Sequence, residues 1–143
     1  MIAPALLYRR SLRFFVREVF RQLHSGHPPF ELSWYMQAMC HALEETCRGD
    51  SHRLVTNVPP RYGKSITAAV AFCAWLHGHD PTLKILVGTY GEELARQHDQ
   101  HVRQVMMSPE YRAAFPGTVI DPAGHVRCRR QHRPTRLVRS LRR

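Results

Sequence analysis

The run VPPRYGKS at residues 58–65 limits the possible folds more than any other part of this sequence. It ends in Gly63, Lys64 and Ser65, as does the phosphate-binding P-loop motif G-x-x-x-x-G-K-[S/T]. Residues 53–58 before it read as a short β-strand, and the apolar residues after it repeat with the spacing of a helix. A strand, a loop and a helix in this order are the setting that the motif requires. The sequence therefore predicts an α/β fold with a phosphate-binding loop.

The residue types at the end of this run are suited to binding a nucleoside triphosphate. Main-chain N–H groups and the N-terminus of the following helix form a positive hollow for phosphate oxygens. Gly63 allows close approach, Lys64 would place its ammonium group against the β- and γ-phosphates, and Ser65 would hold magnesium. The motif is incomplete, because Val58 stands where glycine is usual and the two prolines after it lack an N–H group. The alternative interpretation is a chance Gly-Lys-Ser at the start of a helix.

The rest of the chain adds helices and one more strand around this loop. Apolar residues at helical spacing predict helices over residues 12–23, 32–48, 66–76 and 94–106, and Ser108 with Pro109 predicts the start of a short helix that ends near residue 115. The run KILVGTY at 84–90 predicts a second buried strand. We expect a partial parallel sheet with flanking helices, divided into an N-terminal amphipathic helix (1–27), a partial P-loop domain (28–121) and an irregular tail (122–143).

Positive charge is concentrated in that tail. The formal charge is +10, and residues 122–143 contain eight arginines and no acid. The remaining 121 residues carry 13 basic and 11 acidic side chains, a formal charge of only +2. Arg10, Arg13, Arg17 and Arg21 line one face of the first helix, where they would meet DNA phosphate, meet an anionic membrane surface, or form the solvated face, which we favour.

Metal binding and membrane insertion find little support in the sequence. The four cysteines lack the paired spacing of a zinc site, and we interpret them as reduced thiols. His77 with His79, and His98 with His101, each lack a convincing partner pair at ligand spacing. The apolar stretches are far shorter than the ~20 residues that a transmembrane helix needs.

Five segments in order resemble the N-terminal ATPase region of the terminase large subunit of tailed phages and prophages. They are SLRFFVREVF, PPFELSWYMQAMCHALEETCRGD, RLVTNVPPRYGKS, CAWLHGHDP and KILVGTYGEELARQ, and the resemblance spans about residues 10–120. It implies an ATP- and magnesium-dependent motor that packages double-stranded DNA. It further implies a ring oligomer that works with the portal and the small terminase subunit, no membrane association, and the cytoplasm of a bacterial host.

The resemblance also assigns residues to the nucleotide. Arg61 would be the catalytic loop arginine near the γ-phosphate, although a solvated loop cation is an equal alternative. Trp34, Tyr35 and Gln37 would lie near the adenine, and the alternative for Trp34 is helix packing. Thr89 to Leu94 resembles the second motif of the family, but we favour Glu92 and Glu93 as residues that stabilise a helix N-terminus. The expected binding set is Pro60, Arg61, Tyr62, Gly63, Lys64, Ser65, Ile66 and Trp34, with Ser65 on magnesium.

One catalytic element is missing from the sequence. ATP hydrolysis needs an acid at the end of a second buried strand, and the nearest candidate, Thr118 to Asp121, has only two apolar residues before its acid. The resemblance places that strand, and a nuclease domain, beyond residue 143. It also implies that later strands separate the P-loop strand from the next one, so we expect unpaired edges.

Three interpretations of the chain as a whole stay open. We expect a truncated terminase large subunit whose tail arises from a shifted reading frame. The alternatives are a non-enzymatic basic nucleic-acid-binding protein, for which the tail would be a genuine basic arm, and a fragment of another P-loop enzyme such as a helicase.

Overall fold

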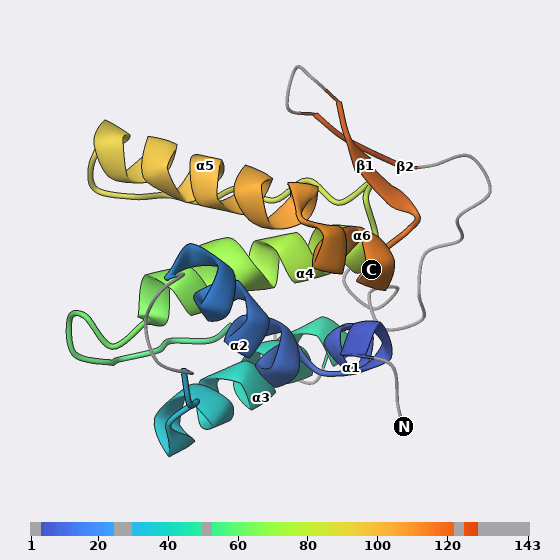
Figure 1. Cartoon of the computed structure of the whole chain (residues 1–143). Coiled ribbons are helices and arrows are strands. Elements are labelled where there is room, and N and C mark those ends of the chain that lie inside the picture. The colour runs from blue at the N-terminus through green and yellow to red at the C-terminus, as the bar shows by residue number, and fades with distance from the viewer. Residues whose placement is uncertain (1–3, 25–29, 50–52, 122–124, 129–143) are drawn as a thin grey trace.

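A computed structural model gives the arrangement of the chain and describes residues 4–24, 30–49, 53–121 and 125–128. Helices pack in layers around a central helix, and a small hairpin lies at one end (Figure 1). None of the described helices is long and apolar enough to cross a bilayer. The elements are α1 (Pro4–Arg10), α2 (Leu12–Leu23), α3 (Trp34–Arg48), η1 (Ile66–Phe72), α4 (Cys73–His79), α5 (Glu92–Met107), α6 (Pro109–Ala114), β1 (Thr118–Ile120) and β2 (Val126–Cys128).

The predicted N-terminal helix is divided into α1 and α2 at Ser11. The Leu12 N–H donates a 2.6 Å hydrogen bond to Oε1 of Glu44 on α3, and the Ser11 hydroxyl donates to the same oxygen at 3.4 Å. A carboxylate at the N-terminus of a helix satisfies otherwise unpaired N–H groups and favours the positive end of the helix dipole. Local sequence predicts one helix here because the cap that begins the second one comes from 32 residues further along the chain.

The central element is the helix formed by Lys64 and Ser65, η1 and α4, which continues without a break to His79. Val70, Ala71, Ala74 and Trp75 are completely buried in the core. The Trp75 indole N–H donates a 2.9 Å hydrogen bond to the Tyr8 carbonyl. The helix that the sequence predicts after Gly63 is therefore confirmed, but its π-helical stretch, Ile66–Phe72, was not foreseen.

The other helical predictions are also confirmed. Gly49 ends α3 in the left-handed conformation, with a φ of 87°, as expected for glycine after a helix. The Ser108 hydroxyl accepts a hydrogen bond from the Tyr111 N–H and so caps α6, with Pro109 in its first turn. The hydroxyl of Tyr111 in turn donates to the Ala74 carbonyl at 2.8 Å, which ties α6 to the central helix.

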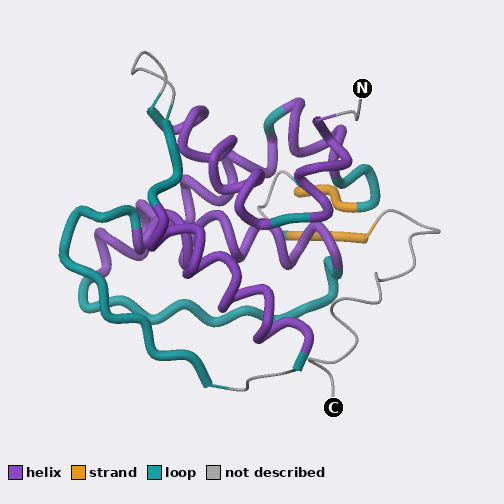
Figure 2. Tube along the Cα trace, turned by 90° about the horizontal axis from the view of Figure 1, so that it is seen from below, coloured by secondary structure: helices purple, strands orange, loops and turns teal. Residues whose placement is uncertain are grey.

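The prediction of strands at 53–58 and 84–90 is wrong for this chain, because both segments are extended loops without a β-ladder. The sheet that the described residues contain is the antiparallel pair β1 and β2. An extended segment becomes a strand only when a neighbour pairs with it, and no ladder joins these two segments to each other or to another described residue. They run in the same direction on one side of the molecule (Figures 1 and 2).

The hairpin corrects two further expectations. Residues 118–120 do form a strand, and residues 126–128, predicted as irregular tail, pair with it, with Val119 opposite Arg127. Asp121 is bound within this hairpin, 2.9 Å from the Arg127 guanidinium and 3.5 Å from His125. Residues 122–124 and 129–143 of the predicted tail lie outside the described residues.

Close contact between helices at Gly78 gives a test of this packing. A Cβ added at Gly78 would lie 2.5 Å from the Phe115 ring, whereas one at Gly88 would meet nothing within 4 Å. Overpacking a tight core contact costs about 1–3 kcal/mol. We expect Gly78→Ala to lower the free energy of unfolding by that amount and Gly88→Ala to change it little, as measured by urea denaturation. Equal stability of the two variants would contradict this arrangement of α4 and Phe115.

Candidate nucleotide-binding site

The loop at residues 58–63 turns the chain from the first extended segment directly into the central helix. Arg61 and Gly63 have left-handed backbones, with φ values of 68° and 73°. The helix begins at Lys64, and the Thr67 N–H donates a 2.9 Å hydrogen bond to the Gly63 carbonyl. A left-handed non-glycine residue such as Arg61 stores backbone strain, which is common in loops that bind ligands.

Two constraints together require glycine at position 63. Its φ of 73° suits a residue without a Cβ. An added Cβ would also lie 2.8 Å from Cζ of Phe20 and 3.0 Å from Cε of Met36. The loop is therefore seated against α2 and α3, and the packing of these helices sets the position where the central helix begins.

Lys64 and Ser65 present their polar groups at the mouth of this loop. Both side chains are exposed. The Lys64 ammonium lies 3.5 Å from the Val58 carbonyl oxygen, so it folds back over the loop toward its first residue. The Ser65 hydroxyl makes no hydrogen bond to any residue that the structure describes. An ammonium group and a free hydroxyl at a helix N-terminus are groups that a magnesium-bound phosphate can engage.

The other predicted loop residues differ in their surroundings. Pro60 and Arg61 are exposed, and Arg61 forms no ion pair with the described acids. Ile66 is partly buried and packs against the core, so its side chain anchors the helix and does not face the loop mouth. The basic groups of this site are therefore Arg61 and Lys64.

Three aromatic rings from two segments lie beside the loop. Tyr62 has its ring centroid 5.5 Å from that of Tyr35 on α3, and Tyr35 lies 6.1 Å from Trp34. Trp34 is 80% exposed, so the interpretation of Trp34 as a helix-packing residue is wrong. The amide of Gln37 is turned back to the Leu32 carbonyl, to which it donates a 2.9 Å hydrogen bond. The contact between Tyr35 and Tyr62 was not predicted, because it joins residues distant in sequence.

The start of α5 lies at the same end of the molecule as the loop, and the β1–β2 hairpin lies at the other end (Figure 1). Glu92 in the first turn of α5 forms a 2.6 Å ion pair with Arg96. Glu92 and Glu93 are both exposed at the helix N-terminus, in keeping with our interpretation of them as stabilising charges. Asp121, the acid considered for magnesium, is in the hairpin and not at the loop.

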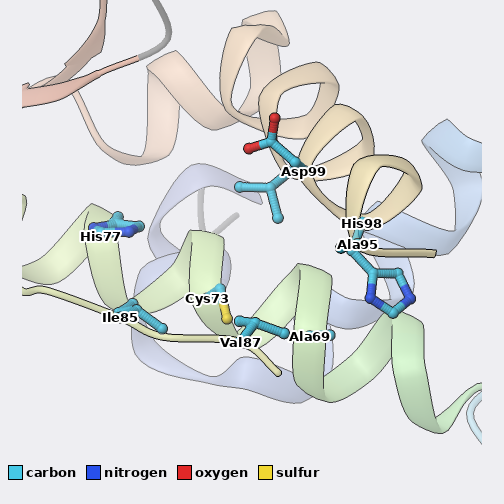
Figure 3. Close-up of a pocket in the computed structure, with 9 residues that line it drawn as sticks. Ala69, Cys73, His77, Ile85, Val87, Ala95, His98 and Asp99 are labelled. Carbon is cyan, nitrogen blue, oxygen red and sulfur yellow. The ribbon is translucent and has the colours of Figure 1, made fainter. Parts of the chain in front are cut away.

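A second hollow, of about 260 Å³, lies between the central helix, α5 and the second extended segment. Cys73, His77, His98 and Asp99 contribute to its lining, but Figure 3 shows them spread along it rather than converging on one point. The described residues contain no group of three or more His, Cys, Asp or Glu side chains arranged for a metal ion. Burial lowers the pKa of His77 and outweighs the opposite effect of Asp80, so burial favours the neutral ring.

The comparisons with known proteins leave the chain without an assigned relative. It matches no family model, no curated protein and no solved structure. The functional argument therefore depends on the residues and geometry described above.

The packing of the loop against α2 and α3 can be tested at Gly63. Gly63→Ala introduces a strained φ and a clash with Phe20, so we expect it to cost about 1–3 kcal/mol of unfolding free energy. Ser65→Ala removes an exposed hydroxyl that makes no described hydrogen bond and should leave stability unchanged. Thermal unfolding of both variants measures this, and an unchanged stability for Gly63→Ala would refute the loop conformation.

The buried cysteines give an independent prediction. Burial raises the pKa of Cys40 and of Cys47 to about 12, and that of Cys73 to about 11. Since the thiolate is the reactive form, these three thiols should resist iodoacetamide at pH 8 in the folded protein. Mass mapping should find them alkylated only after denaturant is added. Rapid modification of the native protein would show that the core around them is open.

Proposed function

We propose that this chain binds ATP and magnesium at the loop of residues 58–65, as the N-terminal ATPase region of a protein of the terminase large-subunit kind. The observation that carries the proposal is the loop geometry. Left-handed Arg61 and Gly63 lead straight into the central helix, and Lys64 lies folded over the loop mouth. In this arrangement the N–H groups at the helix N-terminus and the Lys64 ammonium group would contact the same phosphate.

The residues divide between the parts of the nucleotide. Main-chain N–H groups at the start of the helix bind phosphate oxygens, and Lys64 exchanges its contact with the Val58 carbonyl for the β- and γ-phosphates. Ser65 contributes its hydroxyl to magnesium, which neutralises phosphate charge when bound. Arg61 is exposed at the loop, and its guanidinium would stabilise charge on the terminal phosphate. Trp34, Tyr35 and Tyr62 offer apolar ring surface to the base.

The arrangement around the loop supports the family part of the proposal. Two extended segments run in the same direction, one before and one after the central helix, as the strands of a β-α-β unit do (Figure 1). ATP turnover is not proposed for the described residues by themselves, because Asp121 is bound to Arg127 in the hairpin. Double-stranded DNA, the portal, the small subunit and a ring assembly remain the partners that this proposal implies.

Ion pairs occupy several of the basic side chains on the helices, but not those of the loop. Arg21, Arg48, Arg96 and Arg103 each pair with an acid of their own helix. Exposed ion pairs leave little net field at these positions. Lys64 and Arg61 lack such acidic partners among the described residues and are available to a phosphate, although Arg13 and Arg17 on α2 are likewise exposed without an ion pair to a described acid.

Lys64 and Lys84 are the only two lysines in the sequence, which makes a clean test possible. A fluorescent ATP analogue should bind the full chain in the presence of magnesium. Lys64→Ala should weaken that binding by about 10- to 100-fold, the equivalent of one charge-assisted hydrogen bond of about 1.5–3 kcal/mol. Lys84→Ala, the matched control, should bind like the parent protein.

A chemical experiment gives a second readout. An acyl-phosphate derivative of ATP transfers its acyl group from the terminal phosphate to a lysine amine beside it, with release of ATP, and peptide mapping should find the label on Lys64 and not on Lys84. Circular dichroism checks that the variants fold, which we expect because both lysines are exposed. Equal binding by the two alanine variants, or equal labelling of the two lysines, would refute the proposal.

A further inference from the structure

The hollow between the central helix, α5 and the second extended segment is separate from the nucleotide loop, because none of residues 58–65 lines it. Its volume is about 260 Å³. An apolar cavity of about 150 Å³ in a protein core is enough to bind benzene. Ala95 and Val87 belong to the lining and are exposed, so the hollow opens to solvent. A molecule with one or two aromatic rings can therefore fit and can enter from solvent.

The lining of the hollow is largely apolar. Five of its nine residues are alanine, isoleucine or valine, namely Ala69, Ile85, Val87, Ala95 and Val102. Ile85 and Val102 also pack against the core, so they form a fixed wall. A bound water molecule needs two to four polar partners, which such a wall does not offer. An apolar ring suits the middle of the hollow better than water does.

His98 is the polar group that a molecule in the hollow would meet. Its side chain comes from α5, and the residue is only 9% exposed. Neither ring nitrogen hydrogen-bonds to a described residue, and Nδ1 is completely enclosed whereas Nε2 is not. Figure 3 shows the ring reaching from α5 toward the central helix. Buried polar groups without a partner are unfavourable, so Nε2 is a place for a hydrogen bond from outside the chain.

The other titratable groups of the lining favour an uncharged ligand. Burial raises the pKa of the Cys73 thiol to about 11, and burial lowers the pKa of His77, so both favour their neutral forms near neutral pH. The carboxylate of Asp99 is paired with Arg103, whose Nε lies 2.8 Å away. A charged ligand would lose its hydration here without gaining an unpaired counter-ion from these groups.

We propose that this hollow is a binding site for an uncharged aromatic alcohol of one or two rings. Its hydroxyl hydrogen-bonds to Nε2 of His98, and its ring packs against Ala69, Ile85 and Val102. A hydroxyl group both donates and accepts, so it pairs with either tautomer of the imidazole. The site does not depend on the nucleotide proposal, since the two sites share no lining residue.

The probes are 2-naphthol, naphthalene and 2-naphthoate, which share one ring system and differ in the polar group. Each is titrated into the full chain without nucleotide near neutral pH, and binding is followed by NMR shifts of the Ile85 and Val102 methyl groups. We expect saturable binding of 2-naphthol, tighter than that of naphthalene by about 3- to 10-fold, the value of one neutral hydrogen bond. The anion 2-naphthoate should bind about tenfold more weakly than 2-naphthol or worse.

Two variants with matched controls test the site itself. His98→Leu should remove the preference for 2-naphthol over naphthalene and keep naphthalene binding, while His41→Leu, at an exposed histidine of α3, should keep the preference. Ala95→Leu narrows the hollow and should weaken 2-naphthol and naphthalene by about tenfold. Gln100→Leu, at an exposed position of the same helix outside the lining, should bind as the parent does. Circular dichroism checks that each variant folds.

Several results would overturn this inference. They are an absence of binding by all three probes, which would leave water as the only occupant, equal affinity for 2-naphthol and naphthalene, and a preference that His98→Leu leaves intact. Binding that Ala95→Leu does not weaken would place the probes elsewhere on the protein. Lys64→Ala should bind 2-naphthol like the parent while it loses the ATP analogue. A failure at one site is therefore distinguishable from a failure at the other.

Discussion

Burial of the central helix, residues 64–79, is the constraint on which the rest of this structure depends. Val70, Ala71, Ala74 and Trp75 have no exposed surface, and the other helices cover them. Trp75 and Ala74 also hold α1 and α6 in place through hydrogen bonds with Tyr8 and Tyr111. Because the body of the helix is fixed, its N-terminus is fixed too, and the loop before it must fit between that terminus and the pair α2 and α3. Phe20 and Met36 leave room there for glycine alone at position 63.

Acidic side chains within the helical layers balance much of the basic charge of the described residues. Glu18 is almost fully buried and accepts hydrogen bonds from Arg21, Gln22 and Tyr8, while Arg21 also reaches Glu110 on α6. Burial by itself would raise the pKa of Glu18, but these hydrogen bonds lower it below its usual value. Glu44 similarly accepts a hydrogen bond from the Leu12 N–H at the N-terminus of α2. The loop cations Arg61 and Lys64 take no part in this local pairing among the described residues.

The two sides of the molecule differ in how completely their apolar side chains and backbone groups are covered. Helices close the core on one side, whereas the two extended segments leave backbone groups and apolar side chains uncovered on the other. Such a surface is costly in water unless something pairs with it. The first of these segments leads directly into the loop at residues 58–63.

The sequence by itself determined the helices and the loop residues, because those depend on local spacing and on caps close in the chain. The apolar residues of α2 and of the central helix, Gly49 after α3, and the Ser108 cap are read correctly from neighbours within about one turn. The order of Gly63, Lys64 and Ser65 likewise predicted a loop that leads into a helix, and their role toward a nucleotide stays a prediction. Only the tertiary structure decided the features that depend on distant partners. These include the break at Ser11 made by Glu44, the Tyr35–Tyr62 contact, the exposure of Trp34 and the pairing of Asp121 in a hairpin. They also include the absence of strands at 53–58 and 84–90. A strand needs a neighbour as well as a pattern, and no local signal shows whether that neighbour exists.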